Sequence, residues 1–172
     1  VSAPASTITS ASCGGNSTLS SLAASMTPGT WAQLVVPNQV QILGAASHPS
    51  PGVGMSINFA NKMPWNPITK TIDMCISDHV GATPAMEYTR YIAATNAFEM
   101  TLPAGNAGIS GIGHGYDHTD INPFNGDVYH HKYNSAATVR KRLTDSTFQA
   151  LSSDGAAHQV AEAACYWSGS FT

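Results

Sequence analysis

Two stretches of the sequence share one pattern, in which an Asn-Pro turn joins two strand-forming segments. They are Trp65-Asn66-Pro67-Ile68-Thr69-Lys70-Thr71-Ile72 and Ile121-Asn122-Pro123-Phe124-Asn125-Gly126-Asp127-Val128. Proline fixes φ at the first corner of a turn, and Gly126 tolerates the positive φ that folds the next strand back antiparallel. Because Pro67 and Pro123 are 56 residues apart, the two stretches predict a repeated antiparallel unit.

A second pattern recurs at a spacing of 50 residues. Asn96-Ala97-Phe98-Glu99-Met100 is echoed by Ser146-Thr147-Phe148-Gln149-Ala150, and Thr30-Trp31-Ala32-Gln33-Leu34 has the same form. Four strands in a unit of about 50 residues is typical of a β-propeller blade. The sequence therefore predicts an all-β fold, a partial β-propeller of four-stranded antiparallel blades. Trp31, Phe98 and Phe148 are placed on outer strands, and the segments after Pro67 and Pro123 on inner strands.

The rest of the chain extends this assignment. The spacing of Leu19, Leu22, Ala23 and Met26 predicts one short helix before the Thr27-Pro28-Gly29 turn. Residues 1–28 are therefore read as an N-terminal arm, and residues 29–172 as blades: the outer strand of a closing blade, two full blades and the start of a third. Segments of strand composition, separated by Pro, Gly, Asn and Asp, are 30–36, 39–44, 53–59, 71–77, 85–92, 97–102, 127–133, 138–143, 147–151 and 158–167.

Composition narrows the class of protein. With 172 residues, of which 42% are apolar, the chain is long enough for one sizeable core. Only 10% of the residues are charged and the net charge is −3, which argues against a nucleic-acid partner. The sequence contains no run of about 18 apolar residues, so it predicts no insertion into a membrane. A neutral surface rich in Ser and Thr is typical of secreted or virion-like all-β proteins, so we expect an extracellular or particle-surface location. Cys75, in an apolar strand segment, is expected to be a small buried residue.

Several motifs resemble the kelch or galactose-oxidase-like β-propeller superfamily, in particular its secreted and environmental members. They are Gly29-Thr30-Trp31-Ala32-Gln33-Leu34, Met63-Pro64-Trp65-Asn66-Pro67, His114-Gly115-Tyr116-Asp117-His118 running into Ile121-Asn122-Pro123, and Cys165-Tyr166-Trp167-Ser168-Gly169-Ser170-Phe171. The similarity covers most of residues 28–172, although the double glycine of kelch repeats is missing. The resemblance implies a propeller fold. A copper site of the galactose-oxidase type cannot be mapped onto this sequence residue by residue.

The predicted blades are too few to close a propeller, which needs about four to eight. We therefore expect the chain to be part of a longer polypeptide or of an assembly, with the remaining blades supplied by the same polypeptide or by neighbouring subunits. The strands around Trp31 and Trp167 are where this further polypeptide is expected to pack. Residues 1–172 alone are expected not to form a stable monomer, because unpaired sheet edges and apolar blade flanks would face water.

The densest polar cluster of the sequence lies between residues 114 and 131. It includes the candidate ligand-binding residues His114, Tyr116, Asp117, His118 and His130, to which the aromatic residue Trp65 is added. Neutral imidazoles bind Zn²⁺ and Cu²⁺, so a divalent metal held by His114, His118 and His79, or with Asp117, is one interpretation. The alternative is that these side chains satisfy backbone groups in the turns between blades. No coherent catalytic set is present.

The leading hypothesis for function is therefore binding or structural, with recognition of a glycan or cell surface as its main form. A metal (copper)-dependent oxidoreductase of the galactose-oxidase-like type and a structural component of a virion or filament are the alternatives. A basic stretch, Lys132, Arg140, Lys141 and Arg142, is read either as a solvated strand edge or as a patch that meets an anionic glycan or an acidic partner.

Overall fold

The computed structural model describes residues 18–43, 62–76, 87–102, 118–132 and 137–151. The predicted strands at 53–59 and 158–167, and residues 1–17 of the arm, lie outside the described residues. The predicted short helix is confirmed as α1 (Leu19–Ser25), whose N-terminus is capped by Thr18. The Thr18 hydroxyl accepts a hydrogen bond from the Ser21 amide at 3.3 Å, and Leu22 is the buried residue of this helix.

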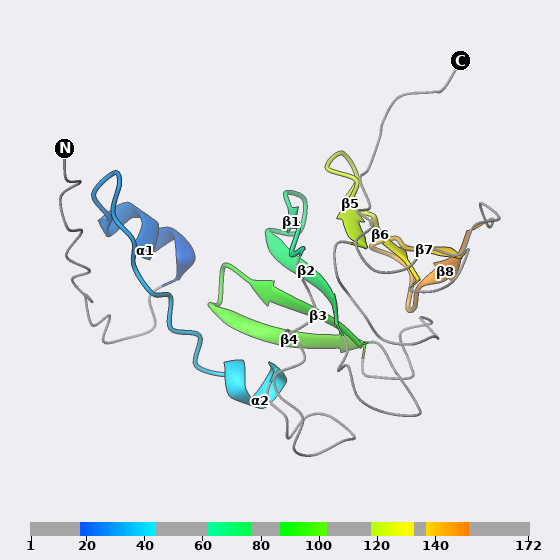
Figure 1. The fold of residues 1–172 in the computed structure, drawn as a ribbon, viewed down its shortest axis with the longest axis horizontal. Coiled ribbons are helices and arrows are strands. Elements are labelled where there is room, and N and C mark those ends of the chain that lie inside the picture. Colours follow the sequence, from blue (N-terminus) through cyan, green and yellow to red (C-terminus); the bar gives the residue numbers. More distant parts are fainter. Residues whose placement is uncertain (1–17, 44–61, 77–86, 103–117, 133–136, 152–172) are drawn as a thin grey trace, which may run out of the picture.

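The rest of the described chain is mostly β, as the sequence predicts. Sheet 1 contains β1 (Trp65–Asn66), β2 (Thr71–Ile76), β3 (Glu87–Ile92) and β4 (Ala97–Leu102), in that order. Sheet 2 contains β5 (Thr119–Ile121), β6 (Val128–His131), β7 (Thr138–Lys141) and β8 (Gln149–Ala150), again in chain order. Every pair of neighbouring strands is antiparallel, so each sheet is a simple meander (Figure 1).

The two Asn-Pro turns have the same local structure. The Asn66 side-chain oxygen accepts from the amides of Ile68 and Thr69, and the Asn122 side-chain oxygen accepts from the amide of Phe124. The fourth turn residue is left-handed in both, with φ of 60° at Lys70 and 79° at Gly126. The positive φ expected at Gly126 is thus confirmed.

The turns lie side by side, because the Asn66 side-chain amide donates to the Gly126 carbonyl at 3.0 Å. This contact places the two Asn-Pro turns at the same end of the pair of sheets. It also leaves little room at Gly126, where a Cβ atom would lie 3.2 Å from both Asn66 Oδ1 and Ile68 Cβ.

Replacing Gly126 with alanine should therefore destabilise the protein by about 2 to 3 kcal/mol, as the sum of left-handed strain and crowding. Gly29→Ala is the matched control, because Gly29 also has a positive φ (83°) but no atom lies within 4 Å of its Cβ position. The control should cost only about 1 to 2 kcal/mol. Denaturant unfolding of both variants measures the two losses of stability. Equal losses would show that the two Asn-Pro turns are not in contact.

Strand pairing is equivalent in the two sheets. Asp73 pairs with Arg90, and Arg90 with Glu99; at the corresponding positions Tyr129 pairs with Arg140, and Arg140 with Gln149. Cross-strand partners share a face, and neighbours along a strand alternate. Each sheet therefore has two faces, which we call the front face and the rear face. The front face of sheet 1 carries Asp73, Cys75, Tyr88, Arg90 and Glu99. The rear face of sheet 2 carries Ile121, Val128, His130, Val139 and Lys141.

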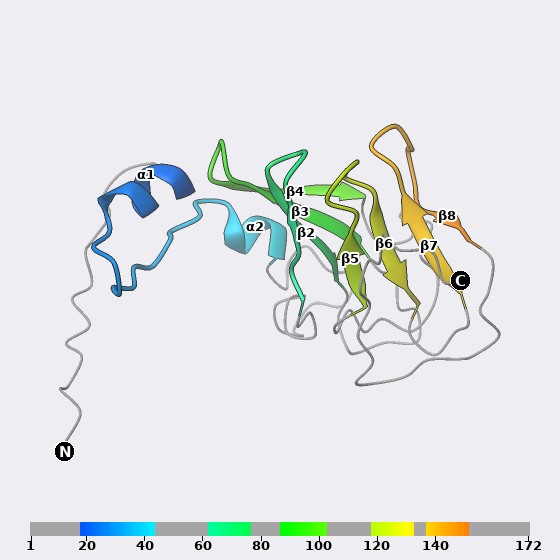
Figure 2. The ribbon, with the colours of Figure 1, turned by 90° about the horizontal axis from the view of Figure 1, so that it is seen from above.

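The two sheets lie side by side (Figure 2), and the core between them joins the front face of sheet 1 to the rear face of sheet 2. Sheet 1 contributes Cys75 and Tyr88, and sheet 2 contributes Ile121, Val128, Val139 and Phe148. Cys75 is buried as predicted, and burial raises the pKa of its thiol. Contact between unlike faces means that both sheets face the same direction, which is a head-to-tail arrangement.

The rear face of sheet 1 is covered by a helix where the sequence predicted a strand. Residues 39–44 were expected to be extended, but α2 (Gln39–Leu43) is helical. Its Leu43 is fully buried against Met74, with Ile42, Ile72 and Phe98 packed around them. The prediction is wrong because burial of Ile42 and Leu43 against the sheet outweighs the β-propensity of this short segment.

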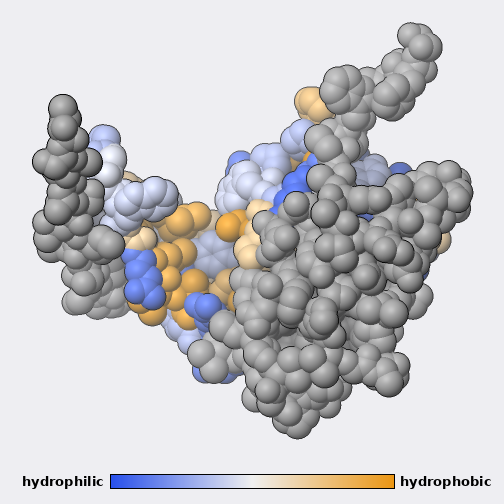
Figure 3. Space-filling model, viewed as in Figure 1, coloured by the Kyte–Doolittle hydropathy of each residue, from blue (hydrophilic) through white to orange (hydrophobic). Residues whose placement is uncertain are grey.

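The strand predicted at 30–36, which includes Trp31, is also wrong. These residues belong to no strand, and Trp31 is 91% exposed. Figure 3 shows an apolar area between α1 and sheet 1, where this segment runs. The outer edge of β4 is instead contacted by Asn38, whose side chain donates to the Phe98 carbonyl at 2.7 Å and accepts from the Phe98 amide at 2.8 Å. Within the described ranges no strand pairs with residues 30–36, so their β-like composition does not produce a strand there.

Candidate functional site

The meander topology gives each sheet two ends, one of which carries the Asn-Pro turns. Strands β2, β4 and β6 end, and β3, β5 and β7 begin, at the end opposite the Asn-Pro turns. His79 belongs by sequence to the connection between β2 and β3, and His114, Tyr116 and Asp117 to the connection between β4 and β5. All four lie outside the described residues, so their predicted roles stay predictions.

At this end the structure brings together three histidines, His118, His130 and His131. The ring centroid of His118 lies 6.2 Å from the centroids of both His130 and His131. His118 and His130 are buried, and His131 is half-buried. Two threonines orient the rings: Thr119 Oγ1 lies 3.0 Å from His130 Nδ1, and Thr138 Oγ1 lies 2.9 Å from His131 Nδ1. Two of the predicted ligand-binding residues, His118 and His130, are therefore neighbours.

Burial between the sheets lowers the pKa of His130 to about 3, and the nearby His118, His131 and Lys132 act in the same direction. The His130 imidazole is therefore neutral at physiological pH. A neutral imidazole is the form that binds metals, but within the described ranges no three His, Cys, Asp or Glu side chains are grouped to hold an ion. The metal set His114, His118 and His79 includes only one described residue, His118.

Trp65 does not join the histidines. It lies in β1, next to the Asn-Pro turn, and thus at the other end of the strands, where 44% of it is exposed. Two further exposed side chains mark this end, Ile68 in the first Asn-Pro turn and Leu143 after β7. Both lie close to Gly126, since a Cβ atom there would be 3.2 Å from Ile68 Cβ and 3.4 Å from Leu143 Cδ1.

Phe124, in the second Asn-Pro turn, is 75% exposed. Its place in the turn corresponds to that of Ile68 at the spacing of 56 residues. We call Trp65, Ile68, Phe124 and Leu143 the turn-end surface. Sequence reasoning singled out Trp65 but missed the other three, although hydrophobic residues within tight turns were visible as an unusual feature.

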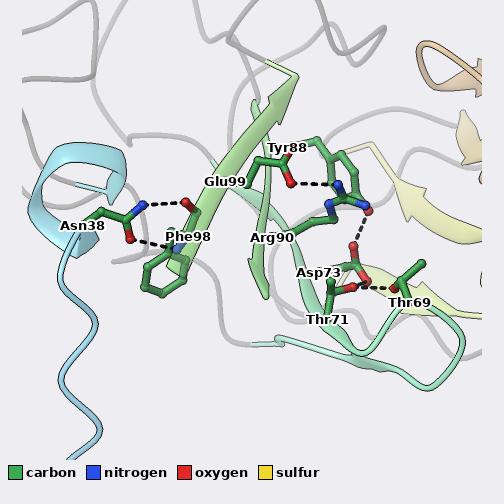
Figure 4. A network of polar contacts seen from close by, with 8 residues as sticks. All are labelled: Asn38, Thr69, Thr71, Asp73, Tyr88, Arg90, Phe98 and Glu99. Atoms are coloured by element: carbon green, nitrogen blue, oxygen red, sulfur yellow. Dashed lines mark hydrogen bonds and ion pairs between the residues drawn. The ribbon is translucent and has the colours of Figure 1, made fainter. Parts of the chain in front are cut away.

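The sequence did not single out a second group, a polar network on the front face of sheet 1 that is buried at Asp73, Thr71 and Tyr88 and exposed at Glu99 (Figure 4). The carboxylate of Asp73 accepts hydrogen bonds from the hydroxyls of Tyr88 and Thr71. Arg90, the cross-strand partner of Asp73, donates to Glu99 at 2.9 Å. Burial raises the pKa of Asp73, while its hydrogen bonds with Tyr88 and Thr71 and the Arg90 charge oppose that rise.

Sheet 2 adds a cation to this network. The Lys141 ammonium lies 5.9 Å from the centroid of the Tyr88 ring and donates to the Asp145 carbonyl at 2.9 Å. Burial lowers the pKa of Lys141; the Arg90 charge acts in the same direction, while Asp145 and Asp73 oppose both. Because Asp73 and Tyr88 are buried and Lys141 of sheet 2 lies over the Tyr88 ring, we assign the network to joining the two sheets.

Comparisons with protein-family models, with curated proteins and with solved structures gave no match for this chain. None of the described helices is long and apolar enough to cross a membrane.

Proposed function

We propose that this chain supplies consecutive blades of an extracellular or particle-surface β-propeller, and that the protein acts by binding surface glycans. The observation that supports a propeller is the head-to-tail contact of the two sheets. With α2 on the rear face of sheet 1, this contact leaves the front face of sheet 2 for a further sheet. Repetition of such a contact produces a ring or an open filament. A ring of four-stranded meanders is a propeller, and further blades would complete it.

The turn-end surface supports a binding role. Exposed aromatic rings on a largely uncharged protein suit the apolar faces of sugar rings, and neighbouring Asn and Thr groups suit their hydroxyls. Phe124 is the strongest candidate for such a contact, because it is 75% exposed. Trp65, from the sequence-level ligand set, would provide a second ring at the same end.

A glycan array with the complete protein tests this proposal. The Phe124→Ala and Trp65→Ala variants should each lose about tenfold in affinity for the bound glycan, since removal of a contacting aromatic side chain costs roughly 1.4 kcal/mol or more. Trp31→Ala is the matched control, because it removes an exposed aromatic ring that lies outside the turn-end surface, and it should leave the affinity unchanged. Absence of glycan binding, or unchanged affinity in both aromatic variants, would contradict the proposal.

A further inference from the structure

The front face of sheet 2 differs from that of sheet 1 in what covers it. In sheet 1 the front-face residues Asp73, Cys75 and Tyr88 are buried under sheet 2. Their counterparts in sheet 2 are, in the same order, Tyr129, His131 and Thr138, and all three are half-buried. Within the described part of the chain, no third sheet lies on this face.

The front faces also differ in charge. Arg90 is paired with Glu99 at 2.9 Å and lies across from the Asp73 carboxylate. Arg140 occupies the same position in sheet 2, but its cross-strand neighbours are the uncharged Tyr129 and Gln149. Among the described residues Arg140 forms no ion pair, whereas Arg90 does; the Nε atoms of both arginines are buried without a hydrogen-bond partner. Asp120, one strand further on, is already paired with Lys62 at 3.2 Å.

The contact between the existing sheets shows what meets a front face. The rear face of sheet 2 places Lys141 over Tyr88 and close enough to Asp73 and Arg90 for their charges to act on it. A cation therefore approaches a front face that carries two carboxylates. On the front face of sheet 2, where Arg140 has no carboxylate at either neighbouring position, the complementary group is an anion.

We infer that the front face of sheet 2 binds the rear face of a third four-stranded antiparallel sheet, which presents a carboxylate to Arg140 from the position that Lys141 holds in sheet 2. This inference rests on the proposed propeller and specifies its next contact. A second copy of the chain is not the occupant, because the corresponding rear face, that of sheet 1, is covered by α2 through Leu43 and Met74.

Site-specific photo-cross-linking in the complete protein tests this inference. p-Benzoylphenylalanine is placed at position 149, where Gln149 is exposed on the outer strand of sheet 2, and cross-linked peptides are identified by mass spectrometry. The expected product joins position 149 to a strand outside the described residues that carries Asp or Glu. The same group at position 99, in place of Glu99, is the internal standard and should cross-link to the rear side of sheet 2.

Charge variants then test the role of Arg140. Arg140→Gln, which removes the charge, and Gln149→Glu, which supplies a carboxylate from within the sheet, are combined with cross-linking at a neighbouring front-face position, Thr138. Each should lower the cross-link yield about tenfold, as expected for loss of an interfacial charge pair. Arg142→Gln, which removes an exposed cation outside the sheet, is the matched control and should leave the yield unchanged.

Three results would overturn the inference: no cross-link from position 149, a cross-link to residues 18–43 of a second copy, or a yield unaffected by both charge variants. If one of these results is obtained but position 99 still cross-links to sheet 2, the contact between sheets 1 and 2 is supported and only the contact with a third sheet is wrong. If position 99 also fails to reach sheet 2, the propeller proposal fails with it. The Phe124→Ala variant tests glycan binding in a separate experiment.

Discussion

Replacing Phe148 with alanine should lower the free energy of unfolding by about 3 to 5 kcal/mol, the range found for truncating a buried aromatic side chain. Phe148 is only 4% exposed and belongs to the core between the sheets. Its ring meets Tyr88 edge to face, with centroids 5.4 Å apart and planes at 86°. Its removal would leave a cavity at the contact that holds sheet 2 against sheet 1.

Phe124→Ala is the matched control for that experiment, because it makes the same chemical change at a ring that is 75% exposed. Its free energy of unfolding should change by no more than about 0.5 kcal/mol. Denaturant unfolding followed by Tyr and Trp fluorescence measures both variants. If Phe148→Ala proved as mild as Phe124→Ala, the two sheets would not share a core, and the head-to-tail arrangement would be wrong.

The second large effect concerns His130 and acid. Its pKa in the folded protein is lowered to about 3 from an ordinary value of 6.5, so the folded state favours the neutral ring. The stability that this provides is complete above pH 6.5 and is lost as the pH falls toward 3. At about 1.4 kcal/mol per pH unit, acidification from pH 6.5 to about 4.5 should cost roughly 2 to 3 kcal/mol through this one residue.

His130→Met is the variant that isolates this effect, because Met74 holds the corresponding buried position in sheet 1. The variant loses the hydrogen bond to Thr119 at every pH, but its stability should fall less steeply below pH 6.5 than that of the wild type. Leu43→Ala serves as control, because it destabilises the core behind sheet 1 and leaves His130 in place. Unfolding curves from pH 7 to 4.5 provide the comparison, and parallel pH profiles for wild type and His130→Met would contradict the burial of a neutral His130.

The candidate site was only partly predictable, for an electrostatic reason. The sequence singled out His118 and His130, but histidine content alone says nothing about protonation, and the neutral state of His130 follows from its burial between sheets. Asp73 was missed because a single acid in an apolar strand has no distinctive pattern. It became recognisable only when strand pairing placed it beside Thr71 and Tyr88.

Local chemistry in the sequence determined the elements whose cause is local. Thr18 and the spacing of Leu19 and Leu22 specify α1, and the Asn-Pro turns followed by Lys70 or Gly126 specify where β2 and β6 begin. Only the tertiary structure decided that residues 39–43 form a helix, because a short apolar segment adopts the conformation in which it packs against its neighbour. Only the tertiary structure decided that residues 30–36 join no strand, because a strand needs a partner. The front-to-rear contact of the sheets likewise came from packing, since alternation along a strand defines two faces but does not say which face meets another sheet.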